Sequence, residues 1–210
     1  MYKISILPEE IDKLPRLSFP GYIEVIDKVD FRYYRAIAYL SRQKVIGFDT
    51  ETRPVFTPGA PHRKVALLQL SGPDKAFLFR ISIIGMRTAL CHILASEKIV
   101  KVGAAVADDV RGLKSYRSFE AGGFVDLQKI GYLWGIRDKS VKKMAAIILE
   151  GRVSKSQQLF NWEADTLSEG QQLYAATDAW VCREMYLRLM DSPKHPLSEE
   201  DLNPKPVQND

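Results

Sequence analysis

Apolar and polar residues follow patterns that predict short strands interleaved with helices. Residues 22–26 alternate as a half-buried strand does, and residues 31–42 carry apolar side chains at helical spacing. Short apolar runs predict further strands over residues 45–51, 65–70, 76–79, 99–103 and 124–127. Helical segments are expected over residues 85–95 and 104–116, from the strand at 124–127 to about residue 149, and over residues 168–190. Ser168 and Gln171 have the spacing of a capping box and mark the start of the last helix. This order of elements predicts an α/β domain with a mixed sheet flanked by helices.

Proline positions and charge suggest the limits of that domain. Residues 1–20 contain three prolines and are expected to form an N-terminal arm or loosely packed extension. Pro193 and Pro196 follow the last predicted helix, and we expect residues 191–210 to form a mobile tail. A single domain would then occupy residues 21–190.

Composition and charge narrow the classes of protein that fit. Hydrophobic residues at 46% and charged residues at 27% are typical of a soluble globular protein, for which we expect a monomer. No apolar run approaches the roughly 18 residues that span a bilayer, and no secretory signal opens the chain, so we expect no membrane partner. Cys91 and Cys182 form no CxxC motif, which favours a reducing, cytoplasmic location. The net charge of +4 is compatible with a polyanionic partner without requiring one.

The strand predicted over residues 45–51 ends in two carboxylates. Asp49 and Glu51 are two residues apart, so their side chains point to the same face of the strand. Two like charges at the end of a buried strand are costly unless a positive charge lies between them. Hard divalent cations prefer carboxylate oxygens as ligands. The pair therefore predicts either a metal site or two solvated acids at the end of a strand.

Two later segments carry acids and a tyrosine. Tyr174 and Asp178 are four residues apart in the last predicted helix and share one of its faces. Such a pair suits an active site, but in isolation it is more often a surface pair. Asp108 and Asp109 fall in the first turns of the helix over residues 104–116, where the helix dipole favours acids even without a function.

Basic residues gather in two stretches. Three prolines and a glycine between residues 52 and 64 exclude regular structure there, and the basic side chains of this loop would suit a phosphate-bearing substrate or a plain surface. Between residues 137 and 155, six basic residues face only two acids nearby, and we interpret them as a solvated helical surface. These residues are Arg137, Lys139, Lys142, Lys143, Arg152 and Lys155.

Taken together, three segments resemble a known family of nucleases. The first consists of residues 45–51 followed by residues 64–70, and the second of residues 101–109. The third consists of residues 161–162 followed by residues 173–179. Their order and spacing are similar to those of the 3′–5′ exonuclease domains with four acids and a tyrosine, the DEDDy class of ribonuclease D and Werner-syndrome exonuclease-like domains. The resemblance covers roughly residues 20–190.

The resemblance implies a ribonuclease-H-like fold with the acids at one edge of the central sheet. It also implies two divalent metal ions, Mg²⁺ or Mn²⁺. Asp49, Glu51 and Asp178 would be ligands of the first ion. Asp49 would bridge to the second, which Asp109 would help to hold through water. Asp109 is preferred to Asp108 because it falls in the register of the family.

The activity that the resemblance implies is hydrolysis of DNA or RNA from the 3′ end, releasing nucleoside 5′-monophosphates. Tyr174 would orient the attacking water, since a phenol with a pKa of about 10 is a poor base at neutral pH. Substrate contacts are expected from Thr50, Arg53, His62, Arg63, Lys64, Gln69 and Trp162. The alternatives are a ribonuclease that trims RNA 3′ ends and a module that binds nucleic acid or protein without cutting it.

Overall fold

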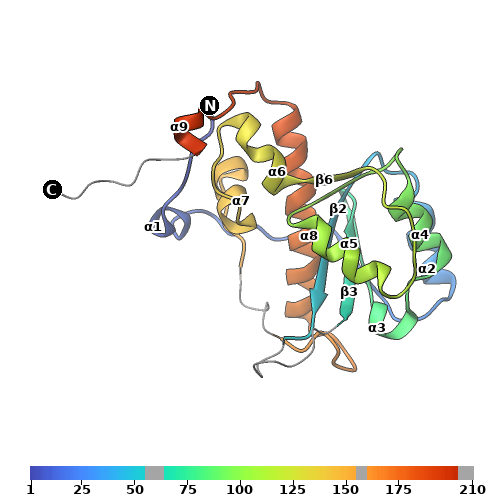
Figure 1. The fold of residues 1–210 in the computed structure, drawn as a ribbon. Coiled ribbons are helices and arrows are strands. Elements are labelled where there is room, and N and C mark those ends of the chain that lie inside the picture. The colour runs from blue at the N-terminus through green and yellow to red at the C-terminus, as the bar shows by residue number, and fades with distance from the viewer. Residues whose placement is uncertain (55–63, 155–159, 203–210) are drawn as a thin grey trace, which may run out of the picture.

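A computed structural model describes residues 1–54, 64–154 and 160–202 (Figure 1). Within these residues a mixed sheet has six strands in the order β1-β4-β3-β2-β5-β6. Strand β3 runs antiparallel to both of its neighbours, and all other neighbouring strands are parallel. The strands are β1 (Tyr22–Ile26), β2 (Val45–Thr52), β3 (Val65–Ser71), β4 (Lys75–Phe79), β5 (Val100–Gly103) and β6 (Phe124–Asp126).

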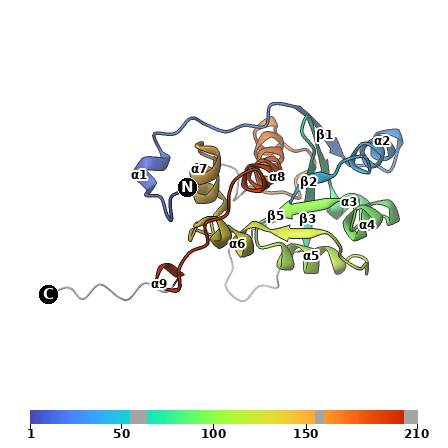
Figure 2. The same cartoon turned by 90° about the horizontal axis from the view of Figure 1, so that it is seen from above.

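Helices cover both faces of the sheet (Figure 2), which confirms the expected mixed sheet flanked by helices. One face packs against α2 (Phe31–Leu40), α3 (Ile81–Ile84), α4 (Thr88–Ala95) and α5 (Val106–Lys114). The other face packs against α6 (Leu127–Ile130), η1 (Gly131–Trp134), α7 (Val141–Leu149) and α8 (Glu169–Met190). None of the helices in the described part of the chain combines the length and apolar character that a bilayer-spanning segment requires.

Helix α8 lies unusually close to β2, because both elements carry small residues where they cross. A Cβ atom added at Gly47 would lie 1.8 Å from the carbonyl oxygen of Ala179, so only glycine fits at this position of β2. The capping box predicted at the start of α8 is present. Ser168 Oγ accepts from the backbone N–H of Gln171 at 3.2 Å, and the Gln171 side chain accepts from the N–H of Ser168 at 3.1 Å.

Two element boundaries differ from the sequence expectation for local reasons. The helix predicted over residues 85–95 begins only at Thr88, and the short helix α3 precedes it. Gly85 separates the two with a φ of 64°, a left-handed conformation that glycine adopts readily and that ends α3. Strand β6 ends at Asp126 because its side chain accepts from the N–H of Gln128 and caps α6.

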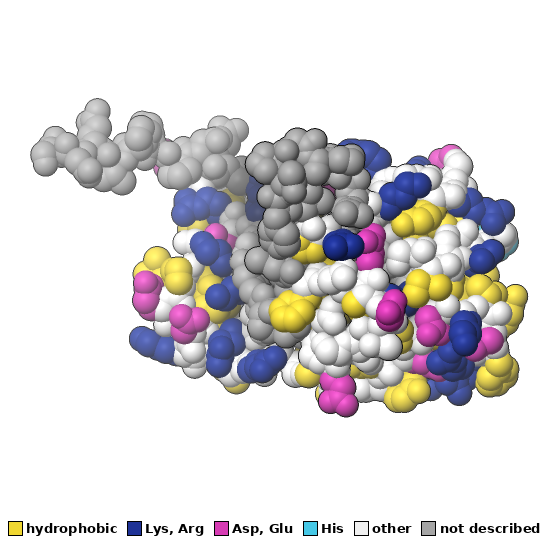
Figure 3. Space-filling view, turned by 90° about the horizontal axis from the view of Figure 1, so that it is seen from below, with side chains coloured by type: hydrophobic (Ala, Val, Ile, Leu, Met, Phe, Trp, Pro, Cys, Tyr) yellow, Lys and Arg dark blue, Asp and Glu magenta, His cyan; other side chains and the backbone are white. Residues whose placement is uncertain are grey.

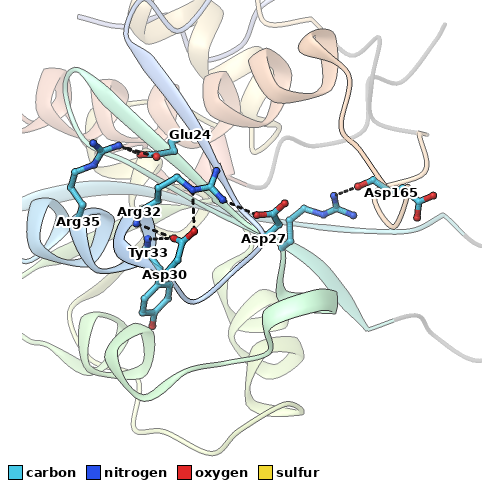
Figure 4. Close-up of polar contacts among 8 residues, drawn as sticks. Glu24, Asp27, Asp30, Arg32, Tyr33, Arg35 and Asp165 are labelled. Carbon is cyan, nitrogen blue, oxygen red and sulfur yellow. Dashed lines mark hydrogen bonds and ion pairs between the residues drawn. The ribbon is translucent and has the colours of Figure 1, made fainter.

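Charged side chains fasten α2 to the edge strand β1 (Figure 4). Asp30 caps α2 by accepting from the backbone N–H of Arg32 at 2.9 Å, and the Arg32 guanidinium also pairs with Asp27 at 3.1 Å. Arg35 pairs with the buried carboxylate of Glu24 on β1 at 2.9 Å. Arg32 and Arg35 of α2 are thus both paired with neighbouring acids.

The N-terminal extension packs more closely on the body than the sequence indicated. Its short helix α1 (Pro8–Ile11) places Ile11 in the apolar cluster beneath α7 and α8. Farther along, the backbone N–H of Leu17 donates to the carbonyl of Arg152 at 2.9 Å. The N–H of Phe19 donates to Thr177 Oγ1 on α8 at 3.0 Å. The extension therefore forms part of the surface beside α8.

The first part of the expected tail also contacts the domain. Trp134 Nε1 donates to the carbonyl of Ser192 at 3.1 Å, and the N–H of Leu197 donates to the carbonyl of Tyr132 at 2.9 Å. The Leu197 side chain is buried, and α9 (Glu199–Leu202) follows. Residues 203–210, for which mobility was also expected, lie outside the described residues.

Candidate active site

Strand β2 and helix α8 bring three carboxylates together. Asp49 and Glu51 lie two residues apart on β2 and point to the face covered by α8, which contributes Asp178. One carboxylate oxygen of each acid lies within 4.8 Å of those of the other two. The pairing of β2 with β3 shifts register between Glu51 and Thr52, so the acids sit where the strand leaves regular pairing.

Asp109 approaches this cluster from α5, on the opposite face of the sheet. Its carboxylate accepts a hydrogen bond of 2.6 Å from the hydroxyl of Thr50, which lies between Asp49 and Glu51 on β2. Among the described residues, the cluster within 4.8 Å does not include Asp109. Asp108, the alternative in the sequence, is 78% exposed at its side chain and pairs with Arg111 at 3.0 Å. The structure therefore turns Asp109, and not Asp108, toward β2.

Tyr174 lies one turn before Asp178 on α8 and is fixed from two sides. Its hydroxyl lies near Asp178 and acts to lower the pKa of that carboxyl, against the larger opposite effect of burial. Its ring packs against the buried ring of Trp162, with centroids 6.0 Å apart. Burial and the nearby acids raise the pKa of the Tyr174 phenol, which is therefore protonated at neutral pH.

The acids share a buried site in which no basic side chain of the described chain pairs with them. Burial, followed by the charges of Asp178 and Glu51, raises the pKa of Asp49 well above its ordinary value. Burial and Asp178 raise the pKa of Glu51 to about 8, and burial raises that of Asp178 to about 7. Burial also raises the pKa of Asp109 to about 6, against the opposing effect of the Thr50 hydrogen bond. No Lys or Arg of the described chain forms an ion pair with these acids.

This donor set fits a divalent cation. Its oxygens are all carboxylate oxygens, which hard cations such as Mg²⁺ and Mn²⁺ prefer. A cation would also offset the burial and the mutual repulsion that raise the pKa values of the acids. The three clustered acids and Tyr174 line a cavity of about 300 Å³, which gives an ion and a substrate group access to them.

Other cavity walls come from residues that the sequence analysis did not assign to the site. The start of α7 contributes Ser140, Val141 and Lys142 to the cavity wall. The segment that follows α7 contributes Val153 and Ser154. Lys142 belongs to the basic stretch that we interpreted as a solvated helical surface, yet it lines the acid cavity. The excess of basic over acidic residues in that stretch was the feature of the sequence that could have indicated a role of Lys142 at the site.

Of the residues predicted to bind substrate, Thr50, Arg53 and Lys64 have partners within the protein. The Thr50 hydroxyl is engaged by Asp109, and Arg53 is exposed and pairs with Glu163 at 3.5 Å. Lys64 is exposed, with its ammonium 5.2 Å from the centroid of the Tyr116 ring. His62 and Arg63 lie outside the described residues.

Gln69 and Trp162 are fully buried, so neither offers a surface to a substrate in this conformation. Gln69 lies directly opposite Asp49 in the β2–β3 pair. Neither polar atom of its amide has a hydrogen-bond partner in the described part of the structure, and the same holds for Trp162 Nε1. Both residues lie next to the acid cluster. Gln69 is paired with Asp49 on the neighbouring strand, and Trp162 packs against the Tyr174 ring.

Comparison with known sequences identifies relatives across most of the chain. The family described as 3′-5′ exonuclease matches residues 27–192. The mouse bifunctional 3′-5′ exonuclease/ATP-dependent helicase WRN is 32% identical over 193 residues, which cover 85% of this chain and 13% of that protein. The Drosophila melanogaster exonuclease 3′-5′ domain-containing protein 2 is 31% identical over 172 residues, covering 79% of this chain and 29% of that protein. The chain thus spans less than a third of either relative.

Solved structures share the fold. Escherichia coli RNase D has a TM-score of 0.71 at 22% identity, covering 81% of this chain and 44% of that one. The Trypanosoma brucei RNase D complex with RNA U12 has a TM-score of 0.71 at 19% identity, covering 83% and 64% of the two chains. The Nibbler EXO domain of Aedes aegypti has a TM-score of 0.70 at 20% identity, covering 83% and 91%. These likenesses confirm the expected ribonuclease-H-like fold.

Proposed function

Because the chain belongs to the family of 3′–5′ exonuclease domains, we propose that it hydrolyses nucleic acid from the 3′ end and releases nucleoside 5′-monophosphates. The activities named for its relatives WRN and exonuclease 3′-5′ domain-containing protein 2 support this reaction. The observation that carries the proposal is the convergence of Asp49, Glu51 and Asp178 on one cavity. Two segments far apart in the sequence, β2 and α8, supply these acids. A pair of solvated acids at the end of a strand would not require a third acid from a distant helix.

Two divalent metal ions, Mg²⁺ or Mn²⁺, are the proposed cofactors. Asp49, Glu51 and Asp178 would hold the first, and Asp49 with Asp109 would hold the second. When bound, these ions would supply the positive charge that activates a water molecule and offsets the charge on the leaving oxygen. The raised pKa values of the acids support this assignment, because no basic side chain of the described chain pairs with these acids.

Tyr174 is proposed to orient the attacking water. Its phenol is protonated at neutral pH and is therefore a hydrogen-bonding group and not a base. The neighbouring Asp178 carboxyl and the Trp162 ring restrict its movement. A fixed hydroxyl next to the acids is suited to holding a water molecule in one orientation.

The proposed substrate is the 3′ end of a DNA or RNA strand. The structure of Trypanosoma brucei RNase D was solved with RNA U12, which supports nucleic acid as the ligand class of the fold. An RNA-trimming enzyme and a module that binds without cutting are the competing functions. The monomeric state and the cytoplasmic location stay predictions from the sequence.

A degradation assay on matched 5′-labelled DNA and RNA strands tests the proposal. With Mg²⁺ or Mn²⁺, we expect a ladder of products that shortens from the 3′ end, and Asp49→Asn should abolish it. Faster loss of the RNA strand would identify the RNA-trimming function. If neither strand is shortened with either metal while the protein still binds them, the binding module is the correct function.

A further inference from the structure

A lysine faces the acid cavity without an acid of its own. Lys142 lies in the first turn of α7, is half-buried and lines the cavity of about 300 Å³ together with Asp49 and Asp178. Its neighbour Lys143 pairs with Asp138 at 2.9 Å, whereas Lys142 forms no ion pair with any described acid. Lys142 therefore adds a positive charge to the wall of a cavity whose other charged lining residues are acids.

The N-terminal extension brings a second cation to an adjoining hollow. A smaller cavity of about 60 Å³ is lined by Arg16 of the extension and by Leu173 and Tyr174 of α8. This cavity shares Val153, Ser154 and Tyr174 with the acid cavity. The two cavities therefore adjoin along these three residues, and Arg16 of the extension lies next to the acid cavity.

Arg16 lies directly opposite a third basic residue. Arg16 and Arg152 form an isolated parallel bridge, in which Leu17 N–H donates to the Arg152 carbonyl and Arg152 N–H to the Pro15 carbonyl, both at 2.9 Å. No acid of the described chain pairs with either guanidinium. Arg152 Nε donates to the carbonyl of Leu14 at 3.0 Å. Both arginines are exposed, so their positive charges are accessible to an anion.

Basic side chains also lie on the surface near these cavities. In the view from below (Figure 3), Lys and Arg side chains lie on the left part of the molecule, with acids among them, and also on the right part. Arg32 and Arg35 on α2 are paired with acids (Figure 4), whereas Arg16, Lys142 and Arg152 form no ion pair with a described acid.

We propose that Arg16, Lys142 and Arg152, here called the basic track, bind the phosphodiester backbone of the substrate strand behind its 3′ end. This inference rests on the proposed function, because the acids would take the 3′ end itself. It assigns a role to the N-terminal extension, which lies outside the matched residues 27–192. Phosphate contacts of this kind fix the position of a strand without reading its sequence.

Binding of a fluorescein-labelled 20-nucleotide single strand, followed by anisotropy in the presence of a chelator, tests the track without hydrolysis. Arg16→Ala/Lys142→Ala should weaken binding about tenfold and lower the slope of log K against log salt by about 1.4, for two lost phosphate contacts. The control Arg42→Ala/Arg117→Ala removes the same charge from exposed positions, with Arg42 before β2 at the end opposite to the acids. The control should bind as the wild type does.

The charge-conserving variant Arg16→Lys/Lys142→Arg should restore most of the affinity, which separates loss of charge from a folding defect. In the degradation assay, Arg16→Ala should raise KM for the 20-nucleotide strand and leave kcat and the KM of a dinucleotide unchanged. Equal losses of affinity in the Arg16→Ala/Lys142→Ala and control variants would overturn the proposed basic track. An unchanged slope of log K against log salt in Arg16→Ala/Lys142→Ala would overturn it as well. A wild type that binds strands through the track but shortens none would overturn the proposed function and leave the track in place.

Discussion

Asp108 and Asp109 are adjacent in the sequence, yet their surroundings differ. Asp108 extends into solvent and pairs with Arg111, whereas Asp109 is held by the Thr50 hydroxyl beside the acid cluster. The helical pattern alone did not separate the two, because both occupy the first turns of α5. The resemblance to the exonuclease family indicated the second of them, and the hydrogen bond from β2 gives the physical reason.

Asp109→Asn is expected to lower kcat about 10- to 100-fold, because the amide cannot supply the negative charge that the proposed second ion would require. Asp108→Asn is the matched control and should retain nearly full activity. Steady-state rates on a labelled strand with Mn²⁺ make the comparison. Equal losses in the two variants would show that Asp109 has no special role.

Tyr174→Phe should lower kcat about 100-fold, because it removes the hydroxyl that we propose orients the water and keeps the ring packed against Trp162. Metal affinity, measured by calorimetry, should stay close to that of the wild type. The exposed Tyr34 provides a control, Tyr34→Phe, for which no change in rate is expected. A large loss of metal affinity in Tyr174→Phe would instead assign the tyrosine to the metal site.

At the scale of elements, the crossing of α8 over β2 determines the spacing of the three clustered acids. β2 contributes Asp49 and Glu51, α8 contributes Asp178, and Gly47 lets the two backbones approach. No side chain larger than hydrogen at residue 47 is compatible with this separation. The site is therefore sensitive to a residue that contacts neither metal nor substrate.

Gly47→Ala is expected to destabilise the fold by about 1–3 kcal/mol, because the new methyl group collides with the Ala179 carbonyl. The shift of α8 should also weaken metal binding. Gly131→Ala serves as control, since its nearest new contact is the flexible end of Met144 at 3.2 Å. Thermal unfolding and metal titration of both variants test this, and a Gly47→Ala protein with unchanged metal affinity would contradict it.

The sequence predicted most elements but not how distant segments meet. Alternation and helical spacing identified the strands and α8, and the capping box located the start of that helix at Ser168. The packing of the extension was not predictable in this way, because Ile11 and Phe19 follow no helical or strand period. Lys142 was read as surface for the same reason, since its place in the cavity wall depends on where α7 lies against the sheet.

At the scale of the whole molecule, the acid cluster makes stability depend on pH. The folded protein raises the pKa of Glu51 to about 8 and of Asp178 to about 7, above the ordinary values of 4.5 and 3.8. A raised pKa favours the protonated folded state, so this contribution is complete below about pH 4 and is lost as pH rises through the folded values. The cluster therefore opposes folding at neutral pH unless a cation is bound.

With a chelator present, the free energy of unfolding should fall by several kcal/mol between pH 4 and pH 8, because each unit of pKa shift corresponds to about 1.4 kcal/mol. Saturating Mn²⁺ should reverse most of that loss at pH 8, because it binds the ionised folded site. Denaturant titrations at a series of pH values measure the effect. The free energy of unfolding should fall less with pH in Asp49→Asn than in the wild type. An equal dependence on pH in the two proteins would contradict the assignment of this effect to the acid cluster.

The hydrogen bond from Phe19 to Thr177 has a practical consequence for anyone preparing a shortened protein. A fragment trimmed to residues 27–192 would retain every acid of the cluster and Tyr174. It would lack Arg16, the hydrogen bond to the residue next to Asp178 and the edge strand β1. Such a fragment would not represent the longer chain, because it would lose a strand of the sheet together with part of the proposed basic track.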